Sequence, residues 1–185
     1  MPPSSALTEL DTFPRLLLNH AATRAVHPAT REKDLGIWQT WTWSQVTEEV
    51  RALACGLAAQ GFKRGMNLAI IGDNRPRLYW TMAAVQALGG VPVPLYQDAV
   101  AEEMVYVLND ADVHFAVVED QEQVDKLLEI RDRCRNLGHI VFDDLEVPLG
   151  VYDGRPPALR ILDASLVAAA LPARRRSSHK GENGH

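Results

Sequence analysis

The chain has 185 residues, of which 46% are hydrophobic, and its formal net charge at pH 7 is −5. This length and composition suit one packed domain and argue against disorder of the whole chain. The acidic balance gives no general attraction to nucleic acid or to an acidic membrane, so we expect no nucleic-acid partner.

The targeting and redox features of the sequence favour a cytoplasmic protein. Residues 1–12 lack the charged-then-apolar order of a signal peptide and are expected to be flexible. No apolar run approaches the roughly 18 residues of a transmembrane segment. Cys55 and Cys134 are far apart and lie in helical patterns, so we expect buried, reduced thiols and neither a disulfide nor a metal site.

The first predicted elements are a helix and a β-hairpin. The helix is expected between Phe13 and Val26, because Pro28 disfavours its continuation. Residues 31–33 and 37–41 follow as two short strands, joined by the glycine-containing turn Asp34-Leu35-Gly36.

A second helix is predicted to begin at a capping box. The Thr42 hydroxyl can accept a hydrogen bond from the backbone N–H of Gln45, and the Gln45 side chain can accept one from the backbone N–H of Thr42. Gly61 is a natural stop for this helix. Its apolar stripe has helical period and consists of Val46, Val50, Leu53, Ala54 and Leu57.

From Asn67 onward, predicted strands alternate with predicted helices. The strands are residues 67–71, 91–95, 113–118 and 139–142, and the helices are residues 76–88, 101–109 and one that Asp120 can cap. Parallel neighbouring strands need such crossovers. The sequence therefore predicts an α/β fold with mostly parallel strands and an early hairpin, within a domain at residues 13–144.

The C-terminal residues carry weaker signals. Residues 145–171 are interrupted by prolines and are expected to be weakly structured, with at most a strand fragment and a short helix in residues 159–170. Residues 172–185 include Arg174-Arg175-Arg176 and are expected to be a disordered basic tail. A nucleic-acid contact is the alternative for this run, but a solvated end fits an acidic domain better.

The turn Gly72-Asp73-Asn74-Arg75-Pro76 lies between a strand and a helix, where many proteins hold a phosphate. It matches neither GxxxxGK[ST] nor GxGxxG. Asp73 would repel an anion, and Pro76 lacks an amide proton. Asn74 suits helix capping and Pro76 the first helical position, so the pattern favours a structural turn.

Other candidate sites are weaker still. His20, His27, His114 and His139 lack metal-ligand spacing, so core-edge or surface roles are favoured. The loop carboxylates Asp143, Asp144 and Glu146 could together bind a cation, but solvated side chains are the commoner outcome. The aromatic residues could line an apolar pocket, although packing is the commoner role; they are Trp38, Trp41, Trp43, Tyr79 and Trp80.

A series of segments, in order and spacing, carries a family resemblance across about residues 13–144. The segments are Arg31-Glu32-Lys33-Asp34-Leu35-Gly36-Ile37-Trp38-Gln39, Thr42-Trp43, Gly56-Leu57 with Gly61 and Gly65, Asn74-Arg75-Pro76, Ala87-Leu88-Gly89, Pro92-Val93-Pro94-Leu95-Tyr96-Gln97-Asp98, Glu102-Glu103 and residues 119–127. Together they resemble the N-terminal part of AMP-forming acyl-CoA synthetases, in the long-chain fatty acid branch of the adenylate-forming superfamily.

The resemblance implies that a fatty acid carboxylate attacks the α-phosphate of Mg-ATP, and that coenzyme A then displaces AMP from the acyl-adenylate. It implies fatty acid, ATP, Mg²⁺ and CoA for the full-length family. The family's phosphate loop, which ends in Gly-x-Pro-Lys, comes after the matched part and is absent from these 185 residues. The resemblance therefore assigns this chain no catalytic, cofactor-binding or metal-binding residue, and no cofactor of its own.

Two departures accompany the resemblance. Gly65-Met66-Asn67 replaces the family's Gly-Asp before the strand, and the likeness fades from Leu145 onward. We therefore expect an N-terminal fragment of a long-chain fatty acid:CoA ligase that is inactive alone. The alternatives are a stand-alone α/β binding module, which could pair with a separately encoded remainder, and a defective product.

Overall fold

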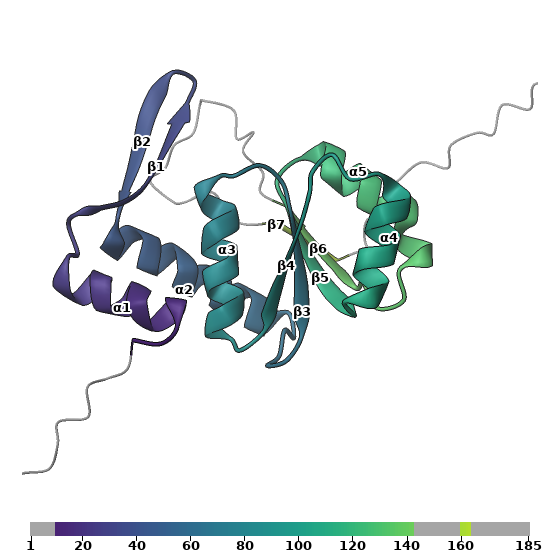
Figure 1. Ribbon diagram of the computed structural model, residues 1–185, viewed down its shortest axis with the longest axis horizontal. Helices are drawn as coiled ribbons and strands as arrows, with labels where there is room; N and C mark the ends of the chain where they lie inside the picture. Colours follow the sequence, from purple (N-terminus) through teal and green to yellow (C-terminus); the bar gives the residue numbers. More distant parts are fainter. Residues whose placement is uncertain (1–9, 143–159, 164–185) are drawn as a thin grey trace, which may run out of the picture.

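The computed structural model describes residues 10–142 and 160–163 as an α/β fold (Figure 1). Its elements, in chain order, are α1 (Phe13–Thr23), β1 (Pro28–Asp34), β2 (Ile37–Thr42), α2 (Trp43–Ala59), β3 (Asn67–Ile71), α3 (Pro76–Ala87), β4 (Val91–Leu95), α4 (Ala101–Asp110), β5 (Val113–Val118), α5 (Gln121–Ile130), the 3-10 helix η1 (Arg131–Arg133), β6 (His139–Phe142) and β7 (Arg160–Asp163). In these ranges, no helix is both long and apolar enough to span a membrane.

The main sheet has the strand order β4-β3-β5-β6-β7. The pairs β3–β4, β3–β5 and β5–β6 are parallel, and β7 pairs antiparallel with β6. Within the described strands, β4 lies at an edge, and Pro92 and Pro94 suit that place because proline cannot donate to a neighbouring strand. The predicted α/β class with mostly parallel strands is confirmed.

Alternate residues of β3 point into two separate cores. Leu68 and Ile70 pack with α2 and α3 on one face, whereas Ala69 and Ile71 pack with α4 and α5 on the other. This alternation follows from the two-residue period of a strand, and helices on both faces explain why β3 is apolar along most of its length. The sheet is therefore the middle layer of the molecule.

The α1 helix and the β1–β2 hairpin lie outside the helical layer of α2 and α3 (Figure 1). Leu17 of α1 joins a buried cluster with residues of α2 and α3. At the base of the hairpin, the rings of Trp41 and Trp80 meet edge to face with centroids 5.3 Å apart. This packing secures one end of the hairpin to the body of the fold.

Two of the predicted helix caps, at the starts of α2 and α5, are present in the structure. The Thr42 hydroxyl accepts from the Gln45 amide while the Gln45 side chain accepts from the Thr42 amide, which completes the capping box of α2. Asp120 accepts from the Gln123 amide at the start of α5. The α2 stripe is buried as predicted, except that Ala54 is only partly buried.

Two residue-level expectations are wrong. Asn74 does not cap α3: the N-cap is Arg75, which makes no side-chain capping hydrogen bond, although Pro76 does take the first helical position. Cys55 is exposed, not buried, and only Cys134 is buried; both thiols are free. The expectations for residues 1–9, 143–159 and 164–185 lie outside the described residues.

Candidate functional site

The carboxyl ends of β3 and β5 form the topological switch point of the sheet. β3 continues into α3 on one face, and its neighbour β5 continues into α5 on the opposite face. Ligands of open α/β sheets bind in the crevice outside such strand ends. The fold therefore predicts that a ligand site, if present, lies at the Gly72–Arg75 turn and at Glu119, the residue after β5.

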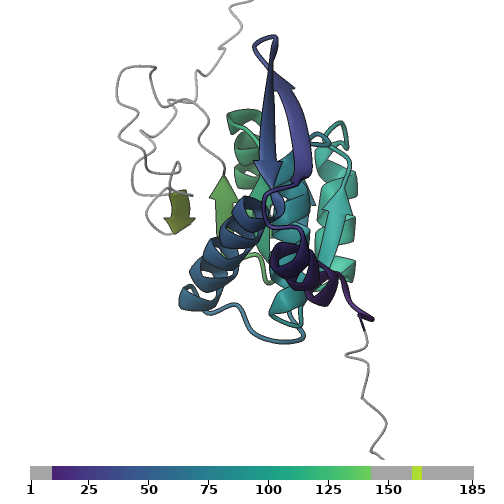
Figure 2. The ribbon, with the colours of Figure 1, turned by 90° about the vertical axis from the view of Figure 1, so that its left-hand side faces the viewer.

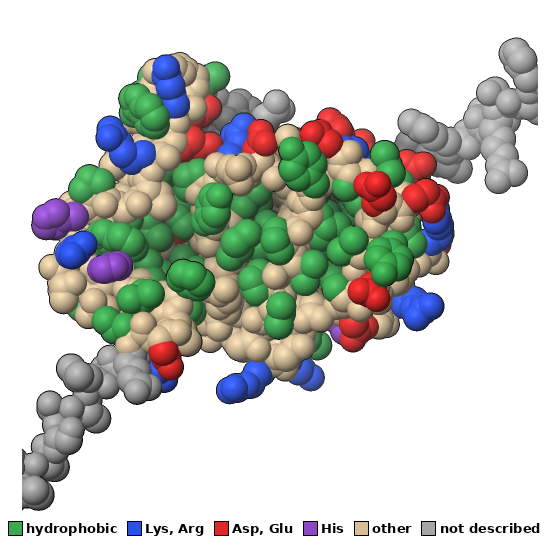
Figure 3. Space-filling model, viewed as in Figure 1, with side chains coloured by type: hydrophobic (Ala, Val, Ile, Leu, Met, Phe, Trp, Pro, Cys, Tyr) green, Lys and Arg blue, Asp and Glu red, His purple; other side chains and the backbone are tan. Residues whose placement is uncertain are grey.

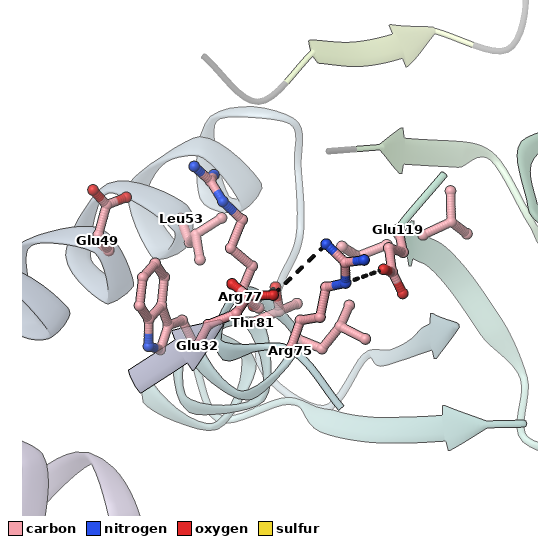
Figure 4. A pocket seen from close by; sticks show the side chains of 11 residues that line it. Glu32, Glu49, Leu53, Arg75, Arg77, Thr81 and Glu119 are labelled. Atoms are coloured by element: carbon pink, nitrogen blue, oxygen red, sulfur yellow. Dashed lines mark hydrogen bonds and ion pairs between the residues drawn. The ribbon is translucent and has the colours of Figure 1, made fainter. Parts of the chain in front are cut away.

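Glu119 closes this crevice by holding the turn that follows β3 (Figure 4). Its carboxylate accepts a hydrogen bond from the backbone N–H of Asp73, with a 2.5 Å N–O distance, and the Nε of Arg75 lies 2.5 Å from its other oxygen. The Glu119 side chain is only 10% exposed. The Asp73 amide and the Arg75 Nε thus already have an acidic partner within the chain.

Gly72 permits the close approach of Glu119. A Cβ on Gly72 would lie 2.6 Å from the Glu119 Cβ and 2.9 Å from the Leu78 Cδ1, closer than real carbon contacts allow. The glycine at the end of β3 is therefore needed for packing against β5, and a role in wrapping a phosphate is not required to explain it.

Arg75 also reaches the hairpin. Its Nη1 atom lies 3.6 Å from a carboxylate oxygen of Glu32 in β1, and the dashed lines in Figure 4 join Arg75 to both acids. The Glu32 side chain is 23% exposed and that of Arg75 is 41% exposed. One guanidinium consequently links the hairpin to the carboxyl edge of the sheet.

Two hollows flank the turn, and their sizes limit what they can hold. The hollow bounded by Glu32, Arg75, Thr81 and Glu119 measures about 40 Å³, which is space for about one water molecule. The hollow on the other side, between the turn and Tyr96 after β4, measures about 290 Å³. The first is too small for a nucleotide, and the second lies just below the usual range of small-molecule sites.

The histidines and the aromatic residues do not gather into a site. The His20 ring packs against Trp43 at an interplanar angle of 43°, His139 stacks on Phe115, and the described residues contain no cluster of three or more potential metal ligands. Trp80 borders the smaller hollow and Tyr79 the larger one, while Trp38 is exposed. The acidic group at Asp143, Asp144 and Glu146 lies outside the described residues.

The environment of Cys134 does not favour an activated nucleophile. Burial raises the pKa of the Cys134 thiol, against the opposing influence of Arg133, and so disfavours the reactive thiolate. Cys55 lies on the exposed face of α2.

Sequence reasoning missed the link between Arg75 and Glu119, which are 44 residues apart. Each belongs to a segment that carries the family resemblance, but no local pattern pairs them. The parallel register supplies the missing information, because Ile71 lies opposite Val118 and the residues that follow share one edge.

A comparison with protein families shows the family of this chain. The family model described as AMP-binding enzyme matches residues 17–161. The chain belongs to this family. The match includes the β1–β2 hairpin, the Gly72 turn and Glu119, so the crevice described above is part of the family's shared region.

Two of the similar proteins are named as CoA ligases of different acids. The chain is 32% identical over 121 residues to the long-chain-fatty-acid–CoA ligase ACSBG2 of Rattus norvegicus, covering 64% of this chain and 18% of that protein. It is 34% identical over 95 residues to 4-hydroxybutyrate–CoA ligase 2 of Metallosphaera sedula, covering 51% of this chain and 17% of that protein. The chain thus spans less than a fifth of these two relatives.

A shorter relative and two solved structures complete the comparison. Rv1549 of Mycobacterium tuberculosis is 31% identical over 120 residues, covering 65% of this chain and 61% of that protein. The anthranilate CoA ligase AuaEII, in complex with anthranoyl-AMP, has a TM-score of 0.65 at 22% identity, over 70% of this chain and 24% of that chain. The N-terminal domain of FACL13 from Mycobacterium tuberculosis has a TM-score of 0.60 at 20% identity, over 66% of this chain and 30% of that chain. These likenesses establish the fold.

Proposed function

We propose that this chain supplies the N-terminal scaffold of an AMP-forming long-chain fatty acid:CoA ligase, and that the 185 residues alone do not form an acyl-adenylate. The family match over residues 17–161 supports the ligase scaffold. The name of the rat relative, at 32% identity, supports a long-chain fatty acid as the substrate.

In the proposed reaction, a carboxylate oxygen of the fatty acid bonds to the α-phosphorus of Mg-ATP and pyrophosphate leaves. The CoA thiolate then bonds to the acyl carbon, and AMP leaves. Both steps need cationic and amide donors around developing phosphate charge. Within the described residues, the Asp73 amide and Arg75, which face the crevice, are already bound by Glu119.

The inactivity of the isolated chain is the first part to test. Purified chain is incubated with palmitate, Mg-ATP and labelled pyrophosphate, and exchange of label into ATP is measured. We expect no exchange above a no-enzyme blank, with full-length rat ACSBG2 as the positive control. Exchange that depends on palmitate and on this chain would contradict the proposal.

The scaffold role is tested by replacement. In rat ACSBG2, the segment aligned with this chain is exchanged for residues 10–142, and acyl-CoA formation is compared with palmitate and 4-hydroxybutyrate. We expect a preference for palmitate. A preference for 4-hydroxybutyrate would favour a short hydroxy acid, the substrate in the name of the Metallosphaera sedula relative. The comparisons give no support to the alternative of a stand-alone binding module.

A further inference from the structure

The β1–β2 hairpin has two chemically different faces. Residues directly opposite one another in an antiparallel pair share a face, and residues two apart on a strand share it too. Glu32 lies opposite Gln39, so Glu32 and Trp41 occupy the same face. Because Glu32 contacts Arg75 and Trp41 contacts Trp80, this face is turned toward the body of the protein.

The opposite face carries cations around an exposed tryptophan. Lys33 lies opposite Trp38 and Arg31 opposite Thr40, which places all four on the outer face. The Arg31 guanidinium carbon lies 5.3 Å from the Trp38 ring centroid, and its Nε donates to the Thr40 hydroxyl at 3.2 Å. Trp38 is 59% exposed. By the same alternation the hairpin's acids, Glu32 and Asp34, belong to the other face, together with Ile37, which lies opposite Asp34.

The tip of the hairpin presents aliphatic side chains to solvent. Leu35 is 86% exposed and Ile37 is 65% exposed. Leu35 and Gly36 have φ angles of 45° and 82°, as in a turn that prefers Asn-Gly. A leucine is disfavoured at such a position, so the sequence retains an apolar side chain where a polar residue would fit the backbone better.

The hairpin stands clear of the rest of the molecule (Figures 1 and 2). In Figure 3, lysine, arginine and hydrophobic side chains lie over the hairpin with a few acidic ones beside them, whereas more acidic side chains, interspersed with basic ones, lie over α4 and α5 at the other end. A narrow projection with an aliphatic tip, an exposed tryptophan and cations behind it has the composition of a bilayer-interface anchor.

We propose that the β1–β2 hairpin docks on an anionic lipid surface. Leu35 at the turn enters the boundary between headgroups and acyl chains, Trp38 lies at headgroup level, and Arg31 and Lys33 contact anionic headgroups. Nucleic acid would match the cations and the aromatic ring but not the aliphatic tip, which favours lipid. The inference is independent of the proposed function, since vesicle binding needs neither ATP nor a fatty acid.

The test is co-sedimentation of the full 185-residue chain with vesicles of phosphatidylcholine, with or without phosphatidylglycerol. We expect binding to the mixed vesicles, weakened by salt, and a blue shift of tryptophan emission. Arg31→Gln and Lys33→Gln should each weaken binding about fivefold at low salt. Trp38→Ala should abolish the blue shift, because Trp41, Trp43 and Trp80 are at least partly buried.

Two further variants distinguish a loss of docking from a loss of folding and from nonspecific binding to vesicles. Leu35→Asn suits the positive φ of the turn, so it should retain the fold and still weaken vesicle binding. Tyr106→Ser, at a 70% exposed position on α4, should bind as the parent does. The proposal is overturned by no vesicle binding, by equal losses in Tyr106→Ser and the hairpin variants, or by tighter binding to an RNA oligonucleotide than to the mixed vesicles.

Discussion

Glu119 is the residue on which the candidate site depends. One buried carboxylate satisfies the Asp73 amide and pairs with Arg75, and the absence of a side chain on Gly72 allows it to come so close. The turn that the sequence favours as structural is held in the structure by an internal hydrogen bond and ion pair to Glu119.

The close approach at Gly72 predicts a large difference between two glycine substitutions. Gly72→Ala should lower the free energy of unfolding by about 1–3 kcal/mol, because the new methyl group would overlap Glu119. Gly56→Ala, in the interior of α2 with open space around it, should raise it by about 0.5–1 kcal/mol. Urea denaturation of both variants checks this, and equal effects would show that Gly72 is not tightly packed.

The buried position of Glu119 predicts a second contrast. Glu119→Gln should lower the free energy of unfolding by about 1–2 kcal/mol, because the variant loses a charge-assisted hydrogen bond to Arg75. Glu102 is the matched control: Arg133 holds the pKa of its carboxyl below the usual range, but both side chains are exposed. Glu102→Gln should change stability little in the same urea titration. A larger loss in Glu102→Gln would contradict this interpretation.

The two thiols should differ in reactivity. Cys55 is exposed, whereas Cys134 is buried and its thiol has a raised pKa. Because the thiolate is the reacting species, iodoacetamide should label Cys55 well before Cys134 in the native chain, as measured by mass spectrometry of peptides. Similar labelling rates before denaturation, and not only after it, would be inconsistent with this structure.

At the scale of elements, local signals predicted most helices and strands. β3, β4, β5 and β6 have the predicted bounds, since apolar runs and glycine or proline punctuation are local properties of the sequence. The exposure of Cys55 could also have been predicted from the sequence. Cys55 lies two residues from both Leu53 and Leu57, on the opposite side of the helix from their apolar stripe. The contacts of Arg75 with Glu119 and Glu32 could not be predicted from the sequence, because they depend on which strands are neighbours in the fold.

The capping box of α2 gives a prediction at this scale. Thr42→Ala removes the acceptor for the Gln45 amide and should lower the free energy of unfolding by about 1 kcal/mol. Ser44→Ala, one residue inside the helix and exposed, is the control and should have little effect. Thermal or urea unfolding followed by circular dichroism measures both. An equal loss in the two variants would indicate that general helix propensity, and not the cap, is responsible.

At the scale of the whole molecule, the fold places its helices and its sheet as in adenylate-forming ligases, over a fraction of their length. At the carboxyl ends of β3 and β5, Glu119 binds the Asp73 amide and Arg75, and the hollows on the two sides of this turn measure about 40 and 290 Å³. Because Glu119 already binds these donors, we expect the isolated chain to bind no Mg-ATP at this edge of the sheet.

The most direct test is a titration of the ¹⁵N-labelled chain with Mg-ATP, followed by the NMR signals of the Asp73 amide and its neighbours. If the Asp73 amide stays hydrogen-bonded to Glu119, those signals should not shift as Mg-ATP is added. A parallel titration with sodium sulfate controls for a general salt effect. A saturable displacement of the Asp73 signal by Mg-ATP, absent with sulfate, would contradict the account.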